Sequence, residues 1–140
     1  MRQKPVLNAE DVRQIVAATR AHAESQGWAV SIAVVDDGGH PLYLERLDGA
    51  RASTAQVALA KARTAATLHA PTAGFAARVK DNPALLALDM MPLQGGLPLL
   101  CGAHCVGGIG VSGVQAEQDE QACAAGTAVL ARIWNESRVG

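Results

Sequence analysis

The stretch 30-VSIAVVDDGGHPLYLERLD-48 decides the fold. Apolar residues at alternate positions from Val30 to Val34 give the period of two that is typical of a strand, and the β-branched content favours that conformation. The Asp-Asp-Gly-Gly sequence at 36–39 then supplies residues that tolerate the positive φ angles of a tight turn. We therefore predict a β-hairpin whose strands cover 29–36 and 41–48.

Helix signals lie on both sides of this hairpin. Asn8 followed by Asp11 is typical of an N-cap close to a capping box, and apolar residues then recur at helical spacing until Gly27. Ser53 with Gln56 opens an alanine-rich helix that ends before a proline. The predicted helices are 8–27, 54–69 and 116–135, with one or two short helical pieces in 71–88.

A glycine-punctuated region holds three further apolar runs, each short enough for a strand and too short for a helix. Runs of strands separated by helices, without regular βαβ alternation, indicate an α+β fold with a mostly antiparallel sheet. The length of 140 residues fits one domain, residues 1–140. The three runs are Met90–Leu93, Leu97–Cys101 and Cys105–Ser112.

Composition excludes several classes of function. Twelve Lys and Arg against 13 Asp and Glu give a net charge of −1, which argues against a nucleic-acid partner. No apolar run approaches the ~18 residues of a membrane-spanning helix, so no membrane partner is expected. Arg2 and Lys4 are not followed by an apolar signal segment, and three cysteines are an odd number. We expect free thiols and a cytoplasmic location.

Several residues suggest a pocket for an anionic small molecule. Arg46 and Lys61 provide positive charge, and Thr64 lies on the same helical face as Lys61. The loop glycines 95–96 and the run Gly108–Gly113, which leads into a helix, free backbone N–H groups that can face a carboxylate. The alternative for these glycines is structural, because crowded strands and turns also require them.

Cys101, His104 and Cys105 form a compact cluster of potential metal ligands. Structural zinc sites take four ligands, and only three are close here, so we predict no metal site. A buried thiol pair and a Cys–His nucleophile pair are the alternatives. Asp36 and Asp37 fit either proton transfer or turn formation.

In this order and spacing, six segments resemble the GlcG/HbpS-like family, which also includes the C-terminal domain of PduO. The resemblance covers about 7–130. It implies a profilin-like, three-layer α/β/α arrangement with a five-stranded, mostly antiparallel sheet, and a homo-oligomer. The segments are Val30–His40, Leu44–Ala50, Lys61–Ala65, Gly95–Leu99, Val106–Gly113 and Glu117–Glu120.

The resemblance leaves two functional hypotheses. The first is an oligomeric protein that binds haem or another carboxylate-bearing metabolite. The second is a cofactor-independent catabolic enzyme, a lyase, isomerase or hydrolase acting on an unsaturated hydroxy- or oxo-acid. In the enzyme, Arg46 would clamp a carboxylate, Lys61 would stabilise negative charge, and Asp36 or Asp119 would move a proton. The family's recurring polar positions map onto Asp36, Arg46, Lys61, Thr64, Gly95, Gly96, Gly113, Gln118 and Asp119.

Overall fold

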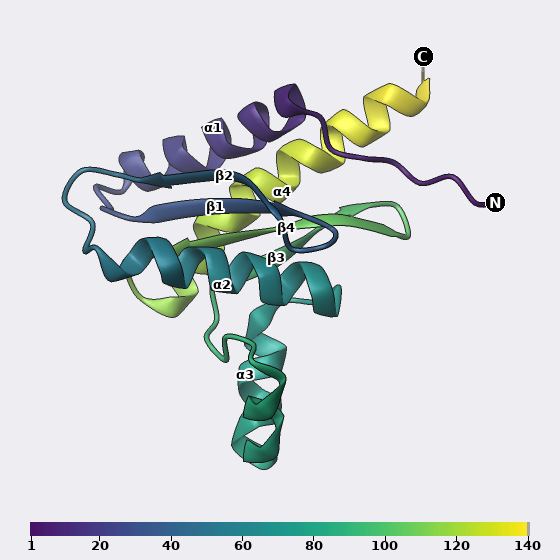
Figure 1. The fold of residues 1–140 in the computed structure, drawn as a ribbon. Helices are drawn as coiled ribbons and strands as arrows, with labels where there is room; N and C mark the ends of the chain where they lie inside the picture. Colours follow the sequence, from purple (N-terminus) through teal and green to yellow (C-terminus); the bar gives the residue numbers. More distant parts are fainter. Residues whose placement is uncertain (140) are drawn as a thin grey trace.

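A four-stranded antiparallel sheet separates helix α2 from helices α1 and α4 in the computed structural model, which describes residues 1–139 (Figure 1). The strand order is β2-β1-β4-β3. This arrangement confirms the predicted α+β class and antiparallel sheet. The elements are α1 (Ala9–Ser25), β1 (Ser31–Asp36), β2 (Pro41–Arg46), α2 (Ser53–Leu68), α3 (Thr72–Asp81), the 3₁₀ helix η1 (Pro83–Leu88), β3 (Gly96–Cys101), β4 (His104–Ser112) and α4 (Ala116–Val139).

The predicted hairpin forms from β1 and β2. The Asp36 Oδ1 atom accepts hydrogen bonds from the backbone N–H groups of Gly38 and His40, both at 2.9 Å. Gly39 adopts a φ of 85°, in the region that favours glycine. The turn therefore forms for the chemical reasons that the sequence indicates.

Alternation along β1 sends its side chains into two different layers. Ile32 and Val34 belong to the main core, which also holds apolar residues of α1 and α4. Ala33 and Val35 face the other way and pack with alanines of α2. Both sets are fully buried, so β1 is covered on both faces as a central strand of a three-layer structure should be.

Glycines in β4 let α2 approach the sheet closely. A Cβ atom built on Gly108 would lie 2.2 Å from the Ala62 carbonyl oxygen, and one on Gly110 would lie 2.1 Å from that of Ala58. Neither distance is sterically possible, so these positions require glycine for packing. The structural alternative for this glycine run therefore holds at these two positions.

The prediction of five strands is wrong, because the sheet has four. The predicted strand Met90–Leu93 has no strand conformation. Pro92 has no backbone N–H to donate to a ladder, and Asp89 just before the run adopts a left-handed φ of 56°. The Met91 N–H instead donates to the Thr64 hydroxyl at 2.9 Å.

The ends of α1 agree closely with the prediction from the sequence, and the end of α4 agrees less closely. Asn8 and Asp11 form the predicted capping box. The last helix continues past the predicted end at Asn135 as far as Val139. Within residues 1–139, no helix combines the length and the apolar character needed to span a membrane.

Candidate functional site

Lys61 and Asp119 form a buried ion pair between α2 and α4. The Lys61 ammonium donates to Asp119 Oδ2 and to the Val111 carbonyl oxygen, both at 3.0 Å. Each side chain is only 3% exposed. The Lys61 ammonium, predicted from the sequence to bind a ligand, is therefore paired with Asp119 inside the protein.

Two glycines make room for this pair. Gly95 has a φ of 125°, and a Cβ atom there would lie 2.6 Å from the Lys61 ammonium nitrogen. A Cβ atom on Gly96 would lie 2.5 Å from the Lys61 carbonyl oxygen. The lack of a side chain at these two glycines thus lets their backbone lie close to Lys61.

The Asp119 carboxylate sits in a strongly desolvated but hydrogen-bonded position. Its Oδ1 atom accepts from the Val114 N–H at 3.2 Å. Burial raises the pKa of the Asp119 carboxyl, and the charge and hydrogen bond of Lys61, with the N–H groups of Val114 and Gly113, offset part of that rise. The pair is therefore a buried polar contact with partners inside the protein.

The remaining predicted polar positions also have internal partners. The Thr64 hydroxyl donates to the Ala60 carbonyl oxygen at 2.8 Å and accepts from Met91. The Gln118 side-chain oxygen accepts from the Gln115 N–H at 3.2 Å, at the start of α4. Gly113 has a φ of 152°, and a Cβ atom there would lie 2.5 Å from the Ala29 carbonyl oxygen.

Arg46 lies apart from this group. It is exposed at the end of β2 and pairs across the hairpin with Ser31 of β1, which in turn pairs with Ser112 of β4. Strand β1 thus separates Arg46 from the strand whose Val111 carbonyl binds Lys61. The structure brings Lys61, Asp119, Gly95, Gly96 and Gly113 together, while Arg46 and the turn residue Asp36 lie elsewhere. A shared Arg46–Lys61 receptor stays a prediction.

The two hairpin thiols lie on opposite faces of the sheet. Cys101 is buried in the core with α1 and α4, while the Cys105 thiol donates to the Ala66 carbonyl oxygen of α2 at 3.6 Å. Burial raises the pKa of both thiols. Among residues 1–139, no group of three or more His, Cys, Asp and Glu side chains is placed to hold a metal ion.

A groove of about 830 Å³ lies at the C-terminal end of α2. We call it the terminal groove. It joins the N-terminal segment, the β1–β2 turn, the end of α2 and the β3–β4 turn. Its lining residues are Met1, Arg2, Gln3, Lys4, Asp37, His69, Ala103, His104 and Cys105.

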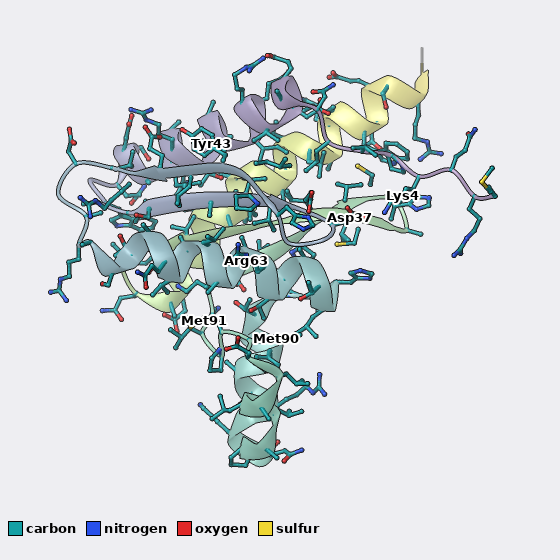
Figure 2. The ribbon with its side chains drawn as sticks, in the orientation of Figure 1. Lys4, Asp37, Tyr43, Arg63, Met90 and Met91 are labelled. Atoms are coloured by element: carbon teal, nitrogen blue, oxygen red, sulfur yellow. The ribbon has the colours of Figure 1, made fainter. Side chains whose placement is uncertain are left out.

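The terminal groove is lined by side chains that can ligate a metal and by side chains that carry positive charge. His69, at the C-cap of α2, and His104 provide imidazoles, and Arg2 and Lys4 provide positive charge. Lys4 forms an ion pair with Asp37 across the groove, and Figure 2 shows the two side chains beside one another. Sequence reasoning missed this site because its four segments are far apart in the chain. Of the cluster Cys101, His104 and Cys105 that the sequence shows, His104 and Cys105 line the groove and Cys101 does not.

Comparison with known proteins gives a consistent set of matches. Residues 7–128 match the family described as "Haem degrading protein HbpS-like". Protein GlcG of Escherichia coli strain K12 is 37% identical over 114 residues, which are 80% of this chain and 85% of GlcG.

Solved structures with the same fold agree. The crystal structure of a double mutant of Streptomyces reticuli HbpS has a TM-score of 0.87 at 37% identity, covering 93% of this chain and 90% of that one. A haem complex of PduOC has a TM-score of 0.84 at 24% identity, covering 89% and 95% of the two chains, and this likeness concerns the fold.

Proposed function

The chain belongs to the HbpS-like family, as its sequence motifs indicate, and on that premise we propose that it binds haem or another carboxylate-bearing small molecule as a homo-oligomer. The family's description names haem, and HbpS is 37% identical to this chain. The observation that carries the proposal is the terminal groove, where imidazoles and cations from four segments meet.

The donor set of the terminal groove fits haem. Haem iron is held in proteins by His, Cys or Met, and His69, His104 and Cys105 all line the groove. Arg2 suits a propionate, since a guanidinium group forms charge-assisted hydrogen bonds with a carboxylate, whereas Lys4 is already paired with Asp37. The volume of about 830 Å³ lies within the range of about 300–1,000 Å³ usual for ligand sites. When bound, haem would supply its iron for redox chemistry.

The wall of the groove supports binding at a subunit boundary. Met1 and Ala103 are its apolar lining residues, whereas the others are polar or charged apart from Cys105. A macrocycle resting there would expose much of its apolar surface, which favours a cover from another molecule. We therefore link ligand binding to self-association.

The enzyme hypothesis gains no comparable support. Lys61, expected to stabilise negative charge, and Asp119, expected to move a proton, satisfy one another in a buried pair, and neither lines the terminal groove. The alternative proton-transfer group, Asp36, accepts hydrogen bonds from the backbone N–H groups of its own turn. The most economical account of the Lys61–Asp119 pair is that it holds α2, β4 and α4 together.

Titration with hemin tests the proposal. We expect a saturable shift of the Soret band at one haem per binding site, and His69→Ala or His104→Ala should weaken binding about tenfold or more. The matched controls are His22→Ala on α1 and His40→Ala in the β1–β2 turn, neither of which lines the groove. A shift that does not saturate, or that survives both groove substitutions and Cys105→Ser, contradicts axial ligation by His69, His104 or Cys105.

A further inference from the structure

The two edge strands of the sheet, β3 and β2, differ in how their outer backbone groups are used. On β3, the Gly95 carbonyl oxygen accepts from the Val111 N–H of β4 at 3.0 Å. The alternation of an antiparallel ladder then turns the backbone groups of Gly96 and Pro98 outward. The Gly96 N–H donates to the Thr72 hydroxyl at 3.0 Å, and proline has no N–H to donate. The β3 edge therefore has no free donor at either position.

The β2 edge is open. The Leu47 N–H donates to the Val30 carbonyl oxygen at 2.9 Å, and the ladder continues with Arg46 opposite Ser31. The same alternation turns the backbone N–H and C=O groups of Arg46 and Leu44 away from β1. Within residues 1–139, no backbone hydrogen bond outside the sheet uses these groups. Strand β2 therefore presents free donors and acceptors along its outer side.

The side chains at this edge are apolar and accessible. Leu42 and Leu44 of β2 are 44% and 47% exposed. Proteins protect edge strands with charges, proline or a covering segment, because an open edge pairs readily with another chain. The one proline of β2, Pro41, stands at its first position and leaves the N–H groups of Leu44 and Arg46 free. The β2 edge thus has the properties of an association site.

A pocket of about 350 Å³ lies beside the same edge, between β2 and the start of α1. We call it the edge pocket. Figure 1 shows α1 running along β2 on one side of the sheet. The charged group of its wall, the Arg13 guanidinium, pairs with Glu10 at 2.9 Å. The wall consists of Asn8, Arg13 and the apolar or aromatic side chains of Leu7, Ala9, Val12, Leu42 and Tyr43.

We propose that β2 binds an extended peptide segment of a partner protein as an added antiparallel strand, with one large apolar side chain of that segment in the edge pocket. In this mode of recognition, main-chain hydrogen bonds supply affinity and side-chain pockets beside the edge supply specificity. Residues directly opposite one another in an antiparallel pair point to the same face of the sheet. The peptide residue opposite Tyr43 is therefore the one that reaches the edge pocket.

Charge at the edge indicates which segment fits. Arg46 is exposed and forms no ion pair within residues 1–139, so an acidic peptide residue opposite it gains a charged partner. The exposed Leu44 favours an apolar residue opposite it. In an antiparallel strand, the segment therefore has an acidic residue, then any residue, then two consecutive apolar residues. The second of these two enters the edge pocket.

A second copy of this chain fits the edge less well. It would add its own β2, whose side chains on the α1 side of the sheet are Tyr43 and Glu45, opposite the core residues Val34 and Ile32. Glu45 accepts from the Tyr43 hydroxyl at 2.7 Å and pairs with Arg20 at 3.2 Å. The second copy would therefore bring a phenol or a carboxylate to an apolar pocket, and burying a carboxylate there is costly.

Fluorescence anisotropy with a labelled peptide, Ser-Glu-Thr-Val-Phe-Val-Ser with blocked ends, tests the site on the whole chain. Its glutamate lies opposite Arg46, its first valine opposite Leu44 and its phenylalanine opposite Tyr43. N-methylation of the first valine removes an N–H that bonds to β2, whereas N-methylation of the phenylalanine removes one that points away. We expect saturable binding that the first modification weakens about tenfold or more and the second leaves within about threefold.

A charge exchange tests the register. Arg46→Glu should weaken this peptide about fivefold and favour the peptide in which lysine replaces the glutamate. Arg132→Glu, which makes the same change of charge at an exposed position of α4, is the matched control and should alter neither affinity. The comparison of the two N-methylated peptides uses the unaltered protein and so does not depend on the folding of any variant.

Three results would overturn the proposal. The first is the absence of saturable peptide binding, and the second is equal binding of the two N-methylated peptides. The third is slow hydrogen exchange at the Leu44 and Arg46 amides without peptide, because this would mean that a second copy already covers the edge.

Discussion

Lys61 illustrates how a single residue can look like a ligand-binding group and act inside the fold. A lysine among alanines predicts a free cation, but its ammonium is held by Asp119 from 58 positions further along the chain. No local sequence pattern indicates a partner that lies so far along the chain. By contrast, Asn8 with Asp11 and Asp36 with its turn were predictable, because each partner lies within four residues.

Removing one partner of the buried pair should be costly. Lys61→Met leaves the Asp119 carboxylate buried without its cation, and we expect the free energy of unfolding to fall by about 3–5 kcal/mol. The double variant Lys61→Met/Asp119→Leu should recover most of that loss, because no unpaired charge remains. Urea denaturation of both variants measures the difference. Equal destabilisation of the single and double variants would mean that lost packing, and not the unpaired charge, is the cause.

Asp36 should contribute to stability in a pH-dependent way. Its partial burial alone would raise the pKa, but the N–H groups of His40 and Gly38 outweigh it and hold the pKa below its usual value. This stabilisation is complete above the unfolded-state pKa of about 3.9 and is lost as the pH falls through the lower folded-state pKa. Asp36→Asn should therefore flatten the decline in stability below about pH 5, measured by urea denaturation across pH. Asp48→Asn, just after β2, is the control and should keep the wild-type slope.

The packing of α2 on β4 is the contact between elements that the glycines explain most fully. Gly110→Ala would bring a methyl group to 2.1 Å from the Ala58 carbonyl oxygen, so we expect a loss of about 1–3 kcal/mol. Gly74→Ala in α3 meets no atom within 4 Å and should instead stabilise the protein by about 0.5–1 kcal/mol. Thermal unfolding of the two variants compares them. If Gly110→Ala loses no stability, helix α2 can move away from the sheet to admit the methyl group.

Whether a segment forms a helix or a strand was more predictable than the number of strands in the sheet. The periods of two and 3.6 placed the hairpin and the long helices correctly, since each pattern is local. The run Met90–Leu93 is apolar for a different reason: it connects η1 to β3, and Met91 is anchored to Thr64 of α2. Apolar composition alone does not separate a strand from such a packed connection.

At the scale of the whole molecule, the arm formed by α3 and η1 projects from the body (Figure 1). Leu86 and Leu88 are 51% and 53% exposed, and η1 has no buried residue. Helices this short are marginal without packing, so the arm is the surface we expect a second copy to cover.

The oligomeric state of arm variants tests this expectation. Leu86→Glu together with Leu88→Glu should shift the protein toward the monomer in analytical ultracentrifugation, because charged residues are costly to bury at an interface. Leu42→Glu on the edge strand β2, where the leucine is 44% exposed, is the matched control and should leave the mass unchanged. Association that persists in the double variant would place the interface elsewhere.

The terminal groove shows why the candidate site was less predictable than the fold. Lys4, Asp37, His69 and His104 come together because the strand order places the β1–β2 turn and the β3–β4 turn at the same end of the sheet as the end of α2. That order is a property of long-range pairing, which no short motif encodes.

The position of the first eight residues affects how the protein should be prepared. Met1 to Lys4 line the terminal groove, and Pro5 to Asn8 line a smaller pocket beside α1 and α4. A polyhistidine affinity tag fused ahead of Met1 would therefore add imidazoles at the mouth of the groove and yield a Soret signal of its own. Purification handles should be cleaved before any spectroscopic titration, and an untagged sample is the reference for every affinity measured.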